Sequence, residues 1–353
     1  MSASRRCRMP KSRPSSGNGS PGSITLALAG DVMLGRLVRD TIRKRGPVYP
    51  WGNVLPTLAE ADLVLVNLEC ALTKETKRWY GSEPKPFHFR ADPDMVAVLT
   101  AGGVDAVALA NNHIGDFGPK GLLETLEVLD RAGIAHGGAG PDLATARAPA
   151  RLAVRGRRLA LFAAADYPAE WAASIGAPGM HFLPIPPRET ELAPLLEGIQ
   201  AERSQVEHIA LSLHWGPNMC EQPPREFRRF AHRMLDAGVD VIWGHSAHLP
   251  QGMELSNGKL VLYDTGDLID DYAVDEALRN DLSAIFLVTV SSAGTERVEV
   301  IPIRIAEQQA RLAEGDDAAW IRSRLARLSA EFGTVLMPED GRLSWCLPSG
   351  EPR

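Results

Sequence analysis

Residues 24–31 read ITLALAGD, and this stretch decides how the rest of the chain is interpreted. Residues 24–29 are apolar apart from Thr25, and Gly30 and Asp31 follow at once. So short a run is typical of a buried strand, because a helix that crosses a membrane needs roughly 18–20 apolar residues. The stretch therefore predicts a buried β-strand that ends on a carboxylate.

Short β-rich runs alternate with helical stretches along the rest of the chain. Strands are predicted at residues 63–68, 106–110, 159–163, 209–213, 239–243 and 260–263, with an antiparallel pair at 283–290 and 297–305. Helices are predicted at residues 34–45, 94–101, 119–132, 224–237 and 314–332. This alternation predicts a mixed α/β domain built in layers.

Three segments are expected along the chain. Residues 1–22 contain Arg and Lys but no acid and are rich in Ser, Pro and Gly, so they are expected to form a disordered basic tail. No convincing linker interrupts residues 23–306, which predicts one domain. Residues 307–353 are expected to form a C-terminal helix followed by an irregular tail.

Composition excludes several classes of protein. Among the 353 residues, 38 Lys and Arg face 44 Asp and Glu, and the net charge of −6 is not that of a nucleic-acid-binding chain. The four cysteines form no CxxC pair, which disfavours a disulfide scaffold or a zinc-thiolate site and favours a reducing cytoplasm. No apolar run matches a signal peptide or a membrane helix, so a cytoplasmic protein without a membrane partner is expected.

Polar clusters follow the predicted strands. They are Gly30-Asp31, Asn67-Leu68-Glu69, Asn111-Asn112-His113, His214-Trp215-Gly216, Gly244-His245-Ser246-Ala247-His248, and Gly266-Asp267 through Asp270-Asp271. Taken singly, Asp31 could cap a helix, Asn111 and Asn112 could form a turn, and His214 could be a core histidine. Ligands of α/β sheets bind outside the carboxyl ends of the strands, so carboxylates, amides and imidazoles gathered there predict a cation site.

The order of these motifs resembles the CapA-type proteins of bacterial capsule and poly-γ-glutamate synthesis, which are relatives of the calcineurin-like metallophosphoesterases. The matching stretches are residues 30–36, 67–69, 111–113 with Asp116 and Gly118, 214–216, and 244–252. The resemblance extends from Ile24 to about Val290. It implies a calcineurin-like metallophosphoesterase fold, a four-layer α-β-β-α sandwich with a metal site at the strand ends.

The resemblance also implies a set of metal ligands. They are Asp31, Glu69, Asn112, His214 and His245. The histidine that the phosphoesterase pattern has two residues after Asp31 is replaced by Met33. The loss of one imidazole favours a single divalent cation, calcium, magnesium or manganese rather than zinc, over a dinuclear transition-metal centre.

Acid–base chemistry is expected from histidines that a carboxylate orients. The available pairs are His113 with Asp31 or Asp116, and His245 or His248 with Asp267 or Asp271. The expected catalytic residues are therefore His113, His245, His248, Asp267, Asp31 and Asp116.

One soluble branch of the family that this chain resembles contains epimerases of lasso-peptide pathways, which invert a Cα centre of a ribosomal precursor peptide. Inversion needs a base on one face of Cα, an acid on the other, and a cation to stabilise the enolate. We therefore predict a metal-dependent peptide epimerase, an isomerase. Two alternatives stay open: a phosphoesterase or amide hydrolase or ligase acting on poly-γ-glutamate-like chains, and a non-catalytic capsule accessory protein.

Overall fold

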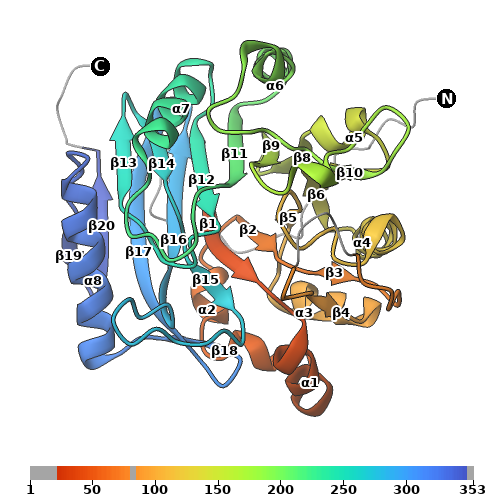
Figure 1. Ribbon diagram of the computed structural model, residues 1–353. Coiled ribbons are helices and arrows are strands. Elements are labelled where there is room, and N and C mark those ends of the chain that lie inside the picture. The colour runs from red at the N-terminus through yellow and green to blue at the C-terminus, as the bar shows by residue number, and fades with distance from the viewer. Residues whose placement is uncertain (1–21, 80–84, 348–353) are drawn as a thin grey trace.

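The computed structural model describes residues 22–79 and 85–347, and most of its strands belong to two large sheets (Figure 1). The order of the first sheet is β19 (Met337–Glu339), β20 (Arg342–Cys346), β17 (Gly294–Ala306), β16 (Leu282–Ser291), β1 (Ile24–Val32), β2 (Leu63–Leu68), β5 (Ala106–Ala108) and β6 (Ala135–Gly137), with β15 (Asp267–Ile269) beside β1 and β18 (Gln309–Leu312) beside β17. The order of the second is β13 (Met253–Ser256), β14 (Lys259–Leu262), β12 (Val241–His245), β11 (His208–His214), β9 (Arg157–Ala165) and β8 (Ala150–Val154).

Helices and two short strand pairs complete the described part of the chain. The helices are α1 (Arg36–Arg45), α2 (Leu55–Leu58), α3 (Val96–Ala101), α4 (Gly118–Ala132), α5 (Leu143–Arg147), α6 (Glu189–Arg203), α7 (Arg225–Asp236) and α8 (Gly315–Ala330). The strand pairs are β3 (Ala71–Leu72) with β4 (Arg90–Ala91), and β7 (Ala139–Gly140) with β10 (Gly179–Met180).

Strand β1 lies inside the first sheet and confirms the strand expected at residues 24–29. It pairs in parallel with β2 and β15 and antiparallel with β16, and it extends through Asp31 to Val32. A Cβ atom at Gly30 would lie 1.6 Å from the carbonyl oxygen of Gly266, so only glycine lets β15 approach β1 this closely. This approach places Asp31 next to the chain that follows Gly266.

Alternate residues of β9 show how the second sheet is sandwiched. Leu159, Leu161 and Ala163 belong to the buried cluster that the two sheets share. Ala160 and Phe162 belong to a separate cluster with the apolar side chains of α6 and α7. The strand is buried on both faces because a sheet covers one and helices cover the other.

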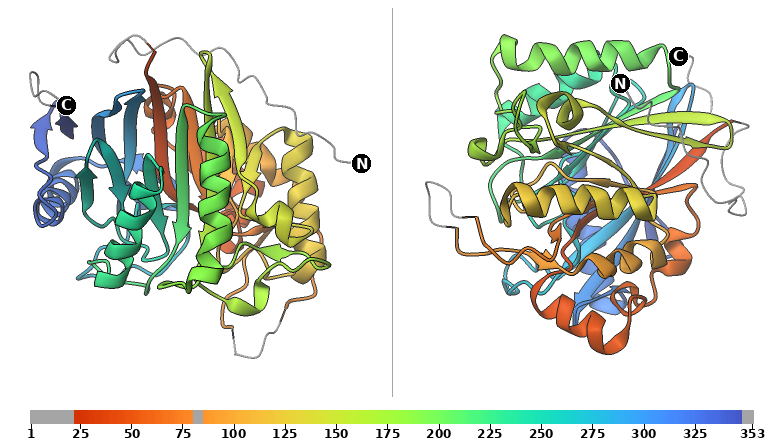
Figure 2. Two further views of the ribbon diagram at one scale, coloured as in Figure 1. Left: turned by 90° about the horizontal axis from the view of Figure 1, so that it is seen from above. Right: turned by 90° about the vertical axis from the view of Figure 1, so that its right-hand side faces the viewer.

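Helices form the two outer layers. In Figure 2, α6 and α7 lie along the outer face of the second sheet, and α1 and α3 lie on the opposite side of the molecule. Helix α8 packs against β16, β17 and β20 at the end of the first sheet. The four-layer α-β-β-α sandwich that the family resemblance implied is confirmed.

Helix α6 was not expected from the sequence. Its residues include Pro194 and Gly198, both of which have poor intrinsic helix propensity. Gly198 nevertheless fits its position, because a Cβ atom there would lie only 3.2 Å from the ring of Phe162. Tertiary packing against β9 thus outweighs the local preference.

The irregular tail expected after α8 is wrong for residues 337–346. Strand β20 pairs antiparallel with β17, with Leu343 opposite Val300, and β19 pairs back onto β20. Asp340 and Gly341 both have positive φ and connect the two strands, as Asp-Gly does in tight hairpins. That dipeptide was the available signal, but the partner of the hairpin, β17, is distant in sequence.

The expected tail at residues 1–22 lies outside the described residues except for Gly22. Among residues 22–79 and 85–347, no helix is both long and apolar enough to cross a lipid bilayer.

Replacing Phe162 with alanine is expected to lower the free energy of unfolding by about 3–5 kcal/mol. Phe162 is 1% exposed and fills the space between β9 and α6, so its loss leaves a cavity. The exposed Arg158 on the same strand is the matched control, and its alanine variant should change stability by no more than about 0.5 kcal/mol. Urea denaturation of both variants measures the difference, and equal effects would contradict this packing.

Candidate functional site

Strand register brings the polar residues of both sheets to one place. Asp31 on β1 lies opposite Asn67 on β2 and Asp267 on β15. In the second sheet, His214 at the end of β11 lies opposite His245 at the end of β12. Residues that are far apart in sequence therefore meet at the carboxyl ends of parallel strands, as expected.

Asn67 holds two of the expected metal ligands in place. Its side-chain Nδ2 donates to Asp31 Oδ1 at 2.7 Å and to Glu69 Oε2 at 2.5 Å. Its Oδ1 accepts from Asn111 Nδ2 at 2.9 Å. Asn111 itself closes a turn, since its Oδ1 accepts from the backbone amides of His113 and Ile114, so the turn interpretation of this residue is correct.

Two groups of metal-ligating side chains occur within the described part of the chain. One comprises Glu69, His214 and His245, and the other comprises Asp31, His248 and Asp267; the ligand atoms of each group lie within 4.8 Å of one another. The groups adjoin, because His245 Nδ1 lies 3.8 Å from Asp31 Oδ1. Asp31, Glu69, His214 and His245 are thus brought together as expected, and two residues expected to be catalytic, His248 and Asp267, join them as possible ligands.

Buried polar atoms at these groups fit a bound cation. Five of them have no hydrogen-bond partner among the described residues: Asp31 Oδ2, Glu69 Oε1, His214 Nδ1, His245 Nδ1 and Asp267 Oδ2. The buried Oδ1 of Asn112, another expected ligand, has none among those residues either. Buried polar atoms without partners are costly, and a cation would satisfy several at once. His245 Nε2 is 2.7 Å from Ser212 Oγ, which fixes the ring and leaves Nδ1 for a ligand role.

The electrostatics of the site show the same need for positive charge. Burial, together with the neighbouring charges of Glu69 and Asp267, raises the pKa of Asp31 well above its usual range. Burial opposes ionisation of His248, but the carboxylates of Asp267 and Asp31 outweigh it and raise the pKa of this imidazole. A cation would relieve the repulsion among the buried carboxylates.

The loop from His245 to His248 is held in an uncommon backbone conformation. Ser246 has a φ of 119° and His248 has a φ of 59°, and residues other than glycine rarely adopt such positive φ values. Asp264 fixes the loop, because its carboxylate accepts from the backbone amides of Ala247 and Gly266, each at 2.7 Å. Burial raises the pKa of Asp264 to about 7. Strain at this loop aims His248 at Asp267, 2.9 Å away.

His113 stands beside the two groups with its own carboxylate. Its Nδ1 is 2.7 Å from Asp116 Oδ2, and its Nε2 is 3.9 Å from Glu69 Oε1. Lys85 pairs with the other oxygen of Asp116 at 2.5 Å and also donates to the carbonyl of Asn112. The ring of Phe89 stacks on His113 at 3.8 Å between centroids. These contacts hold the imidazole with Nε2 facing Glu69.

The structure resolves the pairings that the sequence left open. His113 pairs with Asp116, and His248 pairs with Asp267. Asp271 takes no part in the acid–base set, because its carboxylate accepts from the backbone amide of Leu37 in the first turn of α1. His245 has Ser212 as its hydrogen-bond partner.

Similarity to known proteins bears on this geometry. The family described as "Bacterial capsule synthesis protein PGA_cap" matches residues 25–272. The chain belongs to the PGA_cap family. A "probable polyglutamine synthesis accessory protein" of Mycobacterium tuberculosis is 31% identical over 94% of this chain and 98% of its own length. The capsule biosynthesis protein CapA of Bacillus anthracis is 27% identical over 80% of this chain and 68% of its own.

A solved structure, the Thermus thermophilus sulfate thiohydrolase SoxB in complex with glycerol, is 14% identical with a TM-score of 0.45. It covers 86% of this chain, which spans 60% of the SoxB chain.

Three positioning residues of this PGA_cap protein were missed by reasoning from sequence. Lys85 comes from a segment without a recognisable motif, and Asp264 and Ser212 lie inside or next to apolar strands. A buried polar residue within an apolar run is a weak signal, since most such residues only satisfy backbone groups. Their roles become visible only when the contacts are known.

Proposed function

We propose that this protein is a metal-dependent hydrolase that cleaves a bond in a glutamyl-type chain. The observation that supports it most strongly is the placement of His113 and Asp116 beside two adjoining groups of metal-ligating side chains. The substrate class comes from the relatives, whose names refer to polyglutamine and capsule synthesis. Amide hydrolysis is the reaction that such a chain offers.

One set of residues would bind the cation, and another would transfer a proton. When bound, a divalent cation at these groups supplies Lewis-acid polarisation of a substrate oxygen. His113, whose Nδ1 lies 2.7 Å from Asp116 Oδ2, can take a proton from the attacking water at Nε2 and deliver it to the nitrogen that leaves. Asn67 keeps Asp31 and Glu69 at their spacing. The attacking water contributes its oxygen to the acyl carbon, so that one water is added for each bond cleaved.

A second candidate function is epimerisation of a peptide Cα centre. It is favoured by two histidines that each have a carboxylate partner, His113 with Asp116 at 2.7 Å and His248 with Asp267 at 2.9 Å. Inversion needs two such groups, one for each face of the carbon. His248 is available for this role only if it does not bind metal. The two functions therefore differ in how many ions the site holds.

Elemental analysis of protein purified without added metal is expected to find two divalent ions per chain if the site hydrolyses. In that case His248→Ala should lose one ion, because His248 is a ligand of the group with Asp31 and Asp267. One ion, retained in His248→Ala, would instead favour the epimerase. His232 is the matched control, because it belongs to neither group and its Nε2 lies 2.8 Å from Glu254 Oε1. His232→Ala should keep the full metal content.

The products separate the two functions directly. The protein is incubated in deuterium oxide with γ-linked glutamate oligomers and, separately, with lasso-type precursor peptides. Mass spectrometry then measures the masses of the recovered peptides. Shorter fragments with the added mass of water support the hydrolase. An uncleaved peptide that has gained one deuteron and inverted a centre would overturn it in favour of the epimerase.

A further inference from the structure

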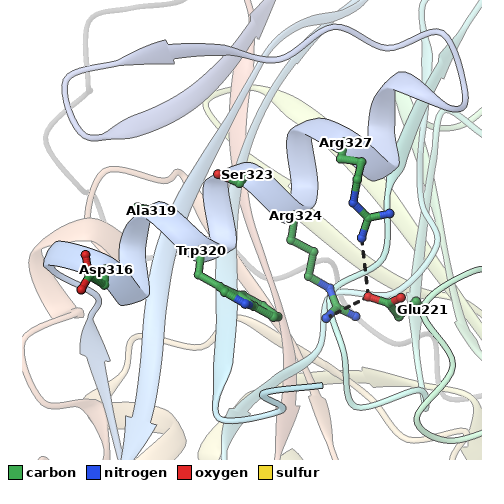
Figure 3. Close-up of a pocket in the computed structure, with 7 residues that line it drawn as sticks. All are labelled: Glu221, Asp316, Ala319, Trp320, Ser323, Arg324 and Arg327. Atoms are coloured by element: carbon green, nitrogen blue, oxygen red, sulfur yellow. Dashed lines mark ion pairs between the residues drawn. The ribbon is translucent and has the colours of Figure 1, made fainter. Parts of the chain in front are cut away.

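A pocket with a volume of about 480 Å³ lies beside α8 (Figure 3), and none of the residues that line it belongs to the metal-ligating groups. One wall is a face of α8, and Glu221, from the segment after β11, stands opposite. Arg324 and Arg327 lie at one end of the pocket and Asp316 at the other, with Trp320 between them (Figure 3). The pocket therefore has both arginines at one end, together with Glu221.

Arg324 is buried with part of its guanidinium unpaired. The residue is 5% exposed, its Nη1 donates to the carbonyl of Leu278 at 3.1 Å, and Nη1 also lies 3.2 Å from Glu221 Oε1. Its Nε and Nη2 are buried and have no hydrogen-bond partner among residues 22–79 and 85–347. A buried guanidinium with unpaired N–H groups is costly, so the native state needs an acceptor here.

The unpaired N–H groups of Arg324 favour an anionic acceptor. Arg327 lies 3.6 Å from the same Glu221 oxygen and 3.6 Å from Glu331 Oε1, so the two guanidinium groups face two carboxylates. Burial lowers the pKa of Arg324, which shows how poorly its charge is solvated. The planar fork of arginine matches a carboxylate with two parallel hydrogen bonds. Asp316 disfavours a second anion at the far end.

We propose that this pocket is a carboxylate-binding subsite for a glutamyl-type chain. Arg324 and Arg327 take one side-chain carboxylate, and the ring of Trp320 packs against the aliphatic carbons beside it. Trp320 is already fixed by its contact with Arg324, whose guanidinium carbon lies 5.0 Å from the ring centroid. The identity of the chain rests on the function proposed above, whereas the carboxylate rests on the pocket itself.

Two segments connect the pocket to the metal-ligating groups. Glu221 belongs to the segment that follows His214, and the amide of Met219 donates to the carbonyl of Ala247, next to His248. Leu278 belongs to the segment after β15, which also carries Tyr272, a neighbour of the His248 ring. A chain bound at the pocket thus lies against the same two segments that shape the site.

Isothermal titration of the full chain with a γ-linked glutamate oligomer and with free glutamate tests the proposal. Arg324→Gln should weaken binding of the oligomer at least about tenfold, because it removes a charge-assisted hydrogen-bonding group. The matched control is Arg322→Gln on the same helix, because Arg322 Nη1 donates to the carbonyl of Gly341. This variant should bind the oligomer as the wild type does. If the oligomer binds no more tightly than free glutamate, the pocket takes a monomer and the proposal of a chain is overturned.

A second variant keeps the test decisive if Arg324→Gln fails to fold. Ala319 is exposed on the wall of the pocket, so Ala319→Trp fills the pocket without removing a buried contact. It should also weaken oligomer binding about tenfold or more. Equal binding in the wild type and Ala319→Trp would overturn the subsite, as would a wild type that binds neither ligand, since water alone would then satisfy Arg324.

The same variant separates this proposal from the function. Ala319→Trp should keep its metal content and still cleave a short substrate that does not reach the pocket. If the wild type cleaves the oligomer and Ala319→Trp binds it with unchanged affinity, the subsite is contradicted and the hydrolase function is not. If the wild type binds the oligomer through Arg324 but never cleaves it, the hydrolase function is contradicted and the carboxylate-binding pocket is supported.

Discussion

Replacing His113 with alanine is expected to lower kcat by about 10²–10⁴-fold while leaving the metal content unchanged. His113 lies outside both ligand groups but next to Glu69, and its Nδ1 is fixed by Asp116 at 2.7 Å. It is therefore placed to move a proton without holding a cation. Turnover of a γ-linked glutamate oligomer and elemental analysis of the same preparation measure the two effects.

A matched variant tests whether Asp116 acts through His113. Asp116→Asn keeps the shape of the side chain but weakens its hold on the imidazole, so kcat should fall while the KM stays nearly constant. Phe117→Leu, next in sequence, is the control and should leave kcat within about twofold of the wild type. Loss of metal in His113→Ala would contradict the role, because it would make His113 a ligand.

Asp31→Asn is expected to make the metal-free protein more stable and the metal-loaded protein less stable than the wild type. Asp31 is fully buried near the carboxylates of Glu69 and Asp267, whose charges help to raise its pKa. Removing its charge relieves both the cost of burying a carboxylate and this repulsion, so the free energy of unfolding of the metal-free protein should rise. The new amide oxygen can still accept from Asn67, so the local hydrogen bond is kept.

Metal should reverse this order. A ligand at about one hundred times its Kd stabilises the native state by about 2.7 kcal/mol, and the variant lacks one carboxylate ligand for it. Thermal unfolding with a chelator and with excess manganese measures both states. Asp264→Asn is the control, because its oxygens accept from two backbone amides and its loss should destabilise both states. A variant that is less stable than wild type in chelator would contradict the account.

The buried charges at this site oppose stability for a physical reason. Buried carboxylates and imidazoles at close range repel or lack partners unless a cation is present. Proteins keep such groups where chemistry needs them, and the rest of the fold must offset the cost. The core shared by the two sheets provides that stability, because residues such as Leu28, Trp243 and Phe286 are fully buried within it.

The sequence by itself indicated a layered α/β domain and the place where polar residues gather. Apolar runs such as residues 24–29 and 63–68 are local signals, and their burial requires a sheet that is covered on both faces. The polar residues directly after these runs must lie near the sheet edge where parallel strands end. Asp31, Glu69, His214 and His245 could therefore be assigned to one site before any contact was known.

Only the tertiary structure decided which groups act on which. His248 pairs with Asp267 and not with Asp271, because β15 is in register with β1 while Asp271 is turned towards the start of α1. The sandwich likewise brings Lys85 to Asp116 and β20 to β17. Such pairings depend on which segments, far apart in sequence, lie side by side, and local composition and periodicity do not specify these neighbours.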